Sequence, residues 1–456
     1  MSDKEKILTE ENIQTEQAEQ SAPAEKKKRI RRRDMTPEQK KKRTIRDLII
    51  TGIVFGVVGL LFACFAISAA VGLSGNYKRV EAIETVDSRF TKVESFNYQT
   101  AAENTVGFDD ETGAWTFVTD GDFTVLQLTD IHIGAGAFSI QKDSWAISAV
   151  AEVVKANRPD LVIITGDIAY PVPFQAGTFN NLKEAELFAT LMEKLGVFWA
   201  ITFGNHDTES YSMYDRKEIA DFYMQERWTK CLFMAGDEDV DGYGNYVINV
   251  QNTSGLLTQS IYLVDSHSYT DGDIFGIAWK YDKIHDNQID WYRGSVAKMN
   301  AINIARGAAE GSVVKSIMFF HIPLVEYRLA WEEFKNNGYK NTDNVKYYYG
   351  KAGEKGEQVY SGKEGCDLFD VMLELGSTKG IFTGHDHLNN FSVDYKGIRL
   401  TYGLSIDYLA YFGIAKQVEQ RGGTLITIKP DGSFDVDPRP MVGDSNEYLF
   451  EYHRQV

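Results

Sequence analysis

Short apolar runs alternate with longer amphipathic segments through most of the chain beyond residue 113. The short runs are rich in β-branched and aromatic residues, as buried strands are, whereas the longer segments place apolar residues at helical spacing. Strands that alternate with helices are typical of a layered α/β domain. The pattern predicts strands at 123–128, 161–165, 197–203, 246–250, 261–264, 313–320, 381–383, 391–394, 398–402 and 424–428, and helices at 144–156, 182–195, 216–225 and 287–306.

Residues 326–365 interrupt this alternation. The segment is rich in Tyr, Lys, Asn and Gly, and it lies between two strongly apolar runs. A long segment of this kind predicts a surface loop. We interpret it either as a lid over a functional site or as an insertion without a role.

The longest apolar run lies near the amino terminus. Residues 48–73 contain no charged side chain, and a helix of that length, at ~1.5 Å per residue, exceeds the ~30 Å hydrocarbon core of a bilayer. We therefore expect a transmembrane helix at residues 47–74. A cleaved signal peptide is the alternative, because Ser68-Ala69-Ala70 resembles a cleavage site, but the apolar run is long and its leader is extended.

The segment before this run is polar and then basic. Residues 1–46 carry 14 Lys/Arg and 9 Asp/Glu, which predicts a disordered basic tail. Positive charge on the amino-terminal side predicts that this tail is cytoplasmic and that the rest lies outside the cell membrane. The expected order is the tail at 1–46, a single-pass anchor at 47–74, a tether with the first strands at 75–113 and a folded domain at 114–456. Gly52 and Gly56 have the spacing of a helix-packing pair, which allows a weak homodimer.

The net charge of −17 hides this division. The tail has a net charge of +5, so the remainder carries about −22. An acidic domain argues against nucleic acid as a steady partner, because phosphate backbones bind basic surfaces. The three cysteines, Cys64, Cys231 and Cys366, are too few for a disulfide framework.

Polar side chains follow five of the apolar runs at the point where each predicted strand ends. Five of the eight histidines lie at these positions. The carboxyl ends of strands are the usual place for chemistry in α/β enzymes, although Asn and Asp in a turn also satisfy local backbone groups. The residues concerned are Asp130 and His132, Asp167, Asn205 with His206 and Asp207, His321, and His385 with His387.

Imidazoles, carboxylates and an amide are ligands for Zn, Mn or Fe. Seven candidate ligands exceed one coordination sphere, whereas a shared carboxylate would serve two ions about 3.5 to 4 Å apart. Such a pair holds a phosphate and activates a water. The sequence therefore predicts two divalent metal ions.

The order D-x-H, G-D, G-N-H-D, H and G-H-D-H resembles that of the calcineurin-like metallophosphoesterases. Longer phrases at 199–207, 281–291 and 320–324 are most similar to the purple-acid-phosphatase-like branch that includes the Dcr2 phosphatases. The resemblance covers residue 123 to the carboxyl terminus. It implies an α/β fold, a four-layer α/β/β/α sandwich, preceded here by the transmembrane helix.

The resemblance also implies a role for each candidate residue. His206 would face the phosphate and donate a proton or a hydrogen bond, and Asp207 would orient its ring. Asp167 would bridge the two ions. One ion would be held by Asp130, His132 and His387, and the other by Asn205, His321 and His385.

Tyr170 and His267 could also belong to the site. Purple acid phosphatases bind ferric iron through a tyrosine after the G-D motif and lack the histidine of the first motif, but this chain has both His132 and Tyr170. We therefore expect Tyr170 to be a pocket wall or core residue. His267 follows another predicted strand, and we expect it to be a structural loop histidine rather than a substrate contact.

The sequence thus predicts a membrane-anchored, outward-facing phosphoesterase that acts by attack of a metal-bridging hydroxide on a phosphorylated small molecule or lipid. A phosphodiesterase or pyrophosphatase acting on lipid or cell-envelope precursors is an alternative. A catalytically silent ectodomain that binds a partner is another. The complete ligand set argues against the silent ectodomain.

Overall fold

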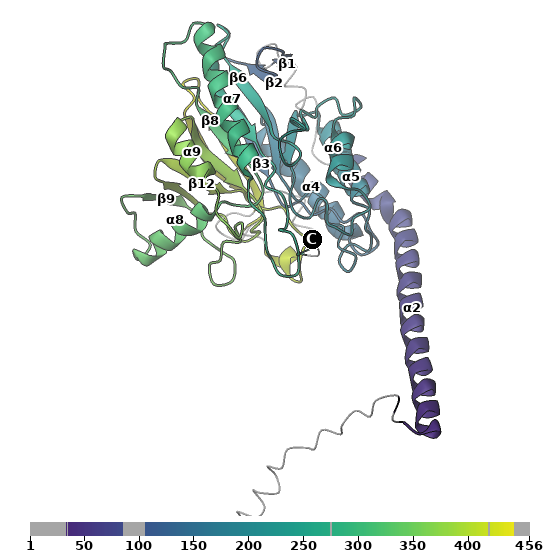
Figure 1. Ribbon diagram of the computed structural model, residues 1–456. Helices are drawn as coiled ribbons and strands as arrows, with labels where there is room; N and C mark the ends of the chain where they lie inside the picture. The colour runs from purple at the N-terminus through teal and green to yellow at the C-terminus, as the bar shows by residue number, and fades with distance from the viewer. Residues whose placement is uncertain (1–32, 34, 85–104, 274–275, 418–419, 442–456) are drawn as a thin grey trace, which may run out of the picture. The chain divides into compact units, whose positions relative to one another are not determined.

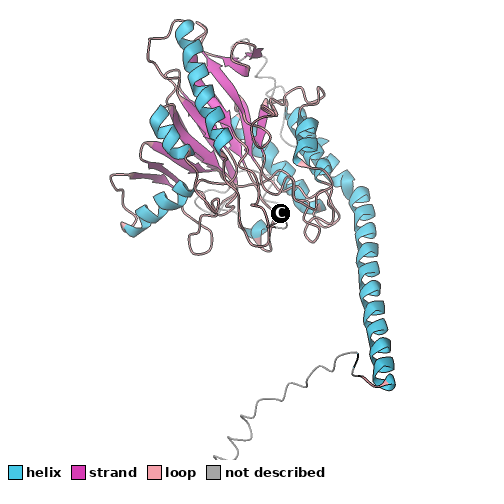
Figure 2. Cartoon of the chain, viewed as in Figure 1, coloured by secondary structure: helices cyan, strands magenta, loops and turns pink. Residues whose placement is uncertain are grey.

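The computed structural model describes residues 33, 35–84, 105–273, 276–417 and 420–441. Two β-sheets and the helices around them make up the described part of the chain beyond residue 104 (Figures 1 and 2). This confirms the predicted mixed α/β fold. The four-layer order of helices and sheets stays a prediction.

The smaller sheet has five strands and holds the first three ligand-bearing segments. Three parallel strands stand next to one another, and each is almost entirely buried, as parallel strands usually are. The two later strands extend the sheet antiparallel. The order is β14 (Phe434–Pro440), β13 (Gly422–Ile428), β3 (Phe123–Leu128), β4 (Leu161–Thr165) and β5 (Trp199–Thr202).

The larger sheet has nine strands. Its centre is parallel, with β7, β8, β10 and β12 running in the same direction. The order is β1 (Thr105–Asp109), β2 (Ala114–Val118), β6 (Tyr246–Gln251), β7 (Leu257–Leu263), β8 (Ser316–Phe319), β10 (Thr378–Thr383), β12 (Ile398–Tyr402), β11 (Ser392–Tyr395) and β9 (Val345–Tyr349).

Helices pack on both sheets. A large core cluster joins α4 (Ile140–Asn157) and α5 (Asn181–Leu195) to strands of both sheets. A second cluster lies between the larger sheet and three helices, α7 (Asp286–Ala305), α8 (Val325–Asn336) and α9 (Leu368–Leu375). The short α6 (Arg216–Tyr223) begins at a capping box formed by Asp215 and Glu218.

The segment 326–365 is not the surface loop that its composition predicts. Most of α8 and all of β9 lie within it, and β9 pairs antiparallel with β11 at the edge of the larger sheet. The tyrosines of this segment belong to a strand. The side chains of Tyr347 and Tyr349 are half-buried, whereas those of Lys346 and Tyr348 are exposed. This alternation is typical of an edge strand.

The amino-terminal helix α2 (Pro37–Glu84) is longer than the predicted 47–74. Its segment Pro37–Ser68 is long and apolar enough to cross a membrane, by length and composition. Most of the predicted basic tail and most of the predicted tether lie outside the described residues. The first described strand of the larger sheet, β1, starts at Thr105, within the segment predicted to hold the tether and the first strands, and pairs along its whole length with β2.

Candidate metal centre

The candidate ligands follow the carboxyl ends of strands in both sheets. Those after β3, β4 and β5 come from the five-stranded sheet, and those after β8 and β10 come from the nine-stranded sheet. Because each set of strands is parallel, each set of side chains emerges at one edge. The seven predicted ligands are brought together at that place.

Tight backbone turns hold these side chains in position. Asp130, His132, Asp167 and His385 all have positive φ, between 52° and 77°. Each such residue costs of order 1–3 kcal/mol, and strain of this kind gathers at functional sites. The site also requires glycine next to these residues, because a side chain would not fit. A β-carbon at Gly204 would lie 2.1 Å from Asp167 Oδ1.

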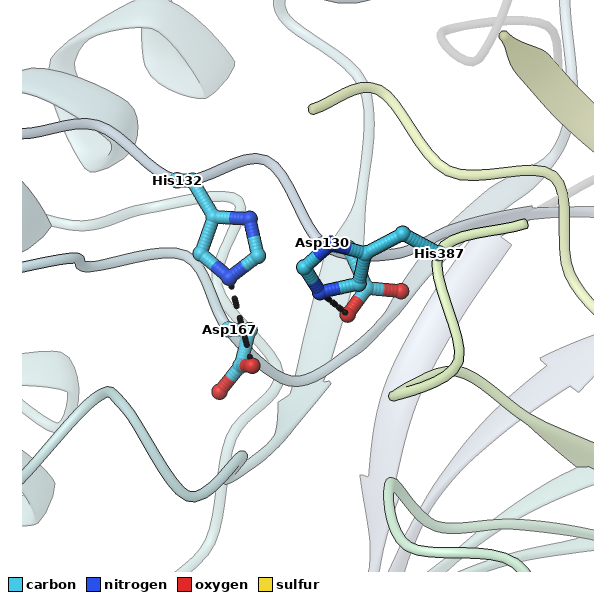
Figure 3. Close-up of side chains that lie close together, drawn as sticks. All are labelled: Asp130, His132, Asp167 and His387. Atoms are coloured by element: carbon cyan, nitrogen blue, oxygen red, sulfur yellow. Dashed lines mark hydrogen bonds and ion pairs between the residues drawn. The ribbon is translucent and has the colours of Figure 1, made fainter. Parts of the chain in front are cut away.

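Four buried residues form one half of the centre, drawn in Figure 3. Asp130, His132, Asp167 and His387 each offer a ligand atom within 4.8 Å of the others. His132 Nε2 lies 3.3 Å from Asp167 Oδ2, and His387 Nε2 lies 3.5 Å from Asp130 Oδ1. Two carboxylates and two imidazoles in this arrangement suit a divalent transition metal.

The other half contains Asn205, His321 and His385. His321 Nε2 lies 3.2 Å from Asn205 Oδ1 and 3.3 Å from His385 Nδ1. It also lies 3.2 Å from Asp167 Oδ2, the same oxygen that faces His132 in the first half. Asp167 therefore stands between the two halves, as a shared carboxylate must.

The hydrogen bonds around this second half show that its inner atoms carry lone pairs. His321 Nδ1 lies 2.7 Å from the carbonyl oxygen of Thr165, which can only accept, so Nδ1 carries a proton and Nε2 holds the lone pair whenever the ring is neutral. Asn205 Nδ2 donates to the Tyr269 hydroxyl at 3.0 Å, which turns Oδ1 inward. Lone pairs that converge without a hydrogen between them repel one another unless a cation lies among them.

The electrostatics of the site agree with this need for positive charge. Burial lowers the pKa of His321, but the Asp167 carboxylate outweighs burial and raises that pKa to about 9. Burial raises the pKa of Asp167, but His321 and His206 hold it well below its usual range. The residues present thus fit metal ions.

Asp407 was not predicted from the sequence, and it faces both histidines of the first half. Its Oδ1 lies 3.3 Å from His132 Nδ1, and its Oδ2 lies 3.0 Å from His387 Nδ1. Peptide N–H groups of Leu409 and Ala410 donate to Oδ1 and hold the carboxylate in place. A carboxylate on the remote nitrogen of a metal-binding histidine fixes the ring and leaves Nε2 for the ion.

His206 lies beside the centre and is its most exposed member, with 23% of its side chain accessible. Its peptide N–H donates to Asp167 Oδ1 at 2.8 Å, and its ring lies 4.8 Å from that of Tyr170. Its Nδ1 contacts Glu209 Oε1 at 2.7 Å. Glu209 was also missed by the sequence reasoning.

The expected role of Asp207 is therefore corrected. Both of its carboxylate oxygens accept backbone hydrogen bonds instead of facing the His206 ring. Oδ2 accepts from the N–H groups of Asp167 and Gly204, at 3.0 and 2.7 Å, and Oδ1 accepts from that of Ala169 at 2.9 Å. Asp207 thus ties the loop after β4 to the loop after β5, and Glu209 is the residue that contacts the His206 ring.

Tyr170 and His267 lie where the sequence analysis expected them. The Tyr170 hydroxyl donates to the carbonyl of Ala410 at 2.7 Å, and burial raises its pKa, so the phenol stays protonated. It forms a wall against His132. His267 contacts Gln288 at 2.8 Å and stacks on His285.

His267, Asp282 and His285 also have ligand atoms within 4.8 Å of one another. Protein partners already account for these contacts, because His285 pairs with Asp241 at 2.7 Å and with Asp282 at 3.3 Å. These residues are only half-buried. We interpret the group as a network of loop ion pairs.

Two buried half-sites that share a carboxylate define a metal-dependent hydrolase centre. Residues 123–389 match the family described as calcineurin-like phosphoesterase. The chain belongs to this family and is a metal-dependent phosphoesterase, which confirms the predicted class. The family and its buried ligands indicate two metal ions.

Several curated proteins are similar to this chain. A protein named "Probable inactive purple acid phosphatase 14" from Arabidopsis thaliana is 28% identical over 316 residues, which cover 65% of this chain and 73% of that protein. "Probable inactive purple acid phosphatase 29" from the same plant is 24% identical over 310 residues, covering 65% and 74%. These relatives confirm the predicted purple-acid-phosphatase-like branch.

Phosphatase DCR2 from Saccharomyces cerevisiae is 27% identical over 296 residues, 60% of this chain and 45% of that protein. The chain thus spans less than half of the yeast phosphatase. A solved dimetal phosphatase from Danio rerio aligns over 70% of this chain and 96% of its own, at 10% identity and a TM-score of 0.43.

Proposed function

We propose that this protein is a membrane-anchored phosphoesterase that hydrolyses phosphate esters with two divalent ions, Mn, Zn or Fe, at the centre described above. Asp130, His132 and His387 would hold one ion. Asn205, His321 and His385 would hold the other, and Asp167 would touch both. The ions, when bound, would polarise the phosphate and lower the pKa of a water, so that it loses a proton and attacks phosphorus as hydroxide.

One observation carries this proposal. Asp167 Oδ2 lies 3.3 Å from His132 Nε2 on one side and 3.2 Å from His321 Nε2 on the other. A single carboxylate oxygen between two imidazole nitrogens, each with further ligand atoms around it, is the arrangement that a shared ligand requires. A carboxylate with only a structural role would need hydrogen-bond donors. The Nδ1 atoms of His132 and His321 are already directed to other protein oxygens, so the neutral rings have no N–H to offer Asp167.

We further propose that His206 donates a proton or a hydrogen bond to the ester. Its exposure and its place beside Asp167 support contact with substrate. Because Glu209 occupies Nδ1, Nε2 is the nitrogen that would meet the leaving oxygen. Glu209 would act through His206 by fixing the direction of its ring.

The anchor and its orientation complete the proposal. The helix Pro37–Ser68 is long and apolar enough to support a single membrane crossing, and the basic residues before its uncharged part, which begins at residue 48, support a cytoplasmic amino terminus. The catalytic domain, with the sheets as the inner layers of a sandwich, would then lie outside. Protease added to intact cells should release this domain. If it survives until the cells are lysed, the orientation is wrong.

The catalytically silent alternative draws support from two relatives whose names call them inactive. The full chain, purified in detergent, should be assayed with each metal against phosphomonoesters, phosphodiesters and pyrophosphates. We expect metal-dependent release of phosphate from at least one class. Metal binding without turnover of any class would favour the silent alternative.

A further inference from the structure

The most exposed large apolar side chains of the catalytic domain lie on loops that leave the sheets at the ligand-bearing ends of the strands. Outside α2, six described apolar residues are at least 60% exposed, and every other exposed large apolar residue of the domain is at most 51% exposed. We call these six the apolar rim: Phe138 (60%), Phe174 (83%), Met213 (66%), Ile277 (79%), Trp279 (66%) and Phe412 (106%).

The apolar rim is not scattered over the surface. Its members lie on the loops that follow β3, β4, β5, β7 and β12, which leave the two sheets at the same edges as the metal ligands. Figure 2 shows many of these loops together below the strands. The exposed apolar side chains elsewhere are spread singly over helices, strand edges and other loops.

Ring contacts connect the rim to the ligands themselves. Tyr411, next to Phe412, stacks on the His387 imidazole with centroids 5.5 Å apart and planes 8° apart. Trp279 packs against Tyr360, whose peptide N–H donates to Asp386, the residue between His385 and His387. Phe412 and Trp279 are thus connected through their neighbours to the segment that carries His385 and His387.

Exposed Phe, Ile and Trp side chains in one region mark a surface that binds an apolar partner. Trp and Phe are also residues that enter the interface of a bilayer. If the chain is anchored as proposed above, a bilayer is always within reach of this domain. The loops that carry the rim contain four Lys/Arg residues, Lys280, Lys283, Lys416 and Arg421, and Arg421 is buried. Charge attraction to an anionic surface is therefore a minor part of what these loops offer.

We infer that the substrate is a phosphorylated lipid and that the apolar rim holds its hydrocarbon part at the bilayer surface while the phosphate enters the metal centre. This inference rests on the proposed function, and it adds the class of substrate. The rim acts by burial of apolar surface, so its contact with lipid is insensitive to salt.

The first test compares dodecyl phosphate with butyl phosphate, using the full chain in detergent with its metals. The parent protein should prefer the long chain in kcat/KM. Replacing Phe174, Ile277 and Phe412 together by Ser should lower this preference by about tenfold, because three apolar contacts are lost. The control, Leu329→Ser with Leu373→Ser, removes exposed leucines from α8 and α9 and should leave the preference unchanged.

The second test does not depend on catalysis. The full chain in nanodiscs of brominated phosphatidylcholine, without added metal, should show quenched tryptophan fluorescence that Trp279→Phe removes. This quenching should persist from about 0.1 to about 1 M NaCl.

The outcomes separate the two proposals. Hydrolysis with no chain-length preference, or no quenching that belongs to Trp279, would overturn the lipid inference and leave the phosphoesterase intact. Quenching of Trp279 without hydrolysis of any phosphate ester would overturn the proposed function. It would also overturn the inference that the lipid is a substrate. A preference that falls equally in the control variant would also overturn the role of the rim.

Discussion

The two histidines of the first half-site share one carboxylate, Asp407, and this contact suggests a direct test of its role. We expect Asp407→Asn to weaken one metal site by about 10- to 100-fold, because the amide neither holds both rings nor supplies their negative partner. Competition with a chelator, monitored by metal analysis, would measure both affinities. Thermal unfolding without metal would report any loss of folding separately.

Asp435→Asn is a suitable control for that variant. The Asp435 side chain is 77% exposed, and it pairs with Lys429 rather than with a candidate ligand. If each metal site binds its ion as tightly in Asp407→Asn as in the parent protein, Asp407 does not support metal binding.

The pair of His206 and Glu209 gives a second prediction at the scale of single residues. His206→Ala should keep both metals and lose about 10²- to 10⁴-fold in rate, because a positioned acid supplies this much. The loss should be smaller for nitrophenyl esters, whose leaving group needs little protonation. Glu209→Gln should show a milder form of the same pattern.

Asp207→Asn separates this role from support of the backbone. Its amide nitrogen would face peptide N–H groups, so the variant should lose about 1 to 3 kcal/mol of folding stability for each unsatisfied donor. The thermal midpoint should fall in Asp207→Asn and not in Glu209→Gln. A His206→Ala protein that loses metal in proportion to its rate would make His206 a ligand.

The seven candidate ligands that the fold brings together could be selected from the sequence because each follows a strand within a few residues, where the fold leaves little choice of direction. Asp407 and Glu209 were missed for a physical reason. Asp407 lies five residues beyond β12 and reaches His132 only through the tertiary fold, and Glu209 is one of several acids in its loop. Asp207 was given the ring-orienting role because it is adjacent in sequence, but its side chain turns back to the loop after β4.

Helix α5 contains a buried acid, Glu184. No described side chain forms a hydrogen bond with its carboxylate. Burial raises the pKa of Glu184 well above its ordinary value of 4.5, and Asp143 and Asp207 raise it further. A group whose pKa is raised in the folded state favours folding most below its unfolded value, and this contribution is lost as pH rises through the folded value.

We therefore expect Glu184→Gln to be more stable than the parent protein at about pH 8, with a difference that shrinks as pH falls toward 4.5. Thermal unfolding across this range would measure the difference. Glu186→Gln changes a more exposed residue of the same helix and should leave the pH profile almost unchanged. A parallel shift of both variants at every pH would contradict the explanation.

Elements with strong apolar runs were predicted closely, as β3, β4 and β12 show. The errors lie where tertiary context decides. Strand β9 has a loop-like composition and is stabilised by pairing with β11, and β14 contains two prolines, which are tolerated because it lies at the edge of its sheet. The pairing of β9 with β11 and of β14 with β13 could not be predicted from local sequence.

At the scale of the whole molecule, two sheets from distant parts of the chain must meet before either metal site is complete. Each half-site draws on both sheets: Asp130 and His132 follow β3 while His387 follows β10, and Asn205 follows β5 while His321 follows β8. We therefore expect bound metal ions to stabilise the contact between the sheets. The order of motifs along the chain revealed this site before the fold was known, but not the apolar rim, whose members are single residues on separate loops.

Asp167 would serve two metal ions at once. Metal analysis of the purified, active full chain, beside Asp167→Asn, tests it most directly. We predict two ions per chain in the parent protein and weakened binding of both in the variant, because the loss of the shared charge leaves two cations facing each other with less neutralisation. A single ion in the active parent protein, bound equally well by Asp167→Asn, would contradict the account.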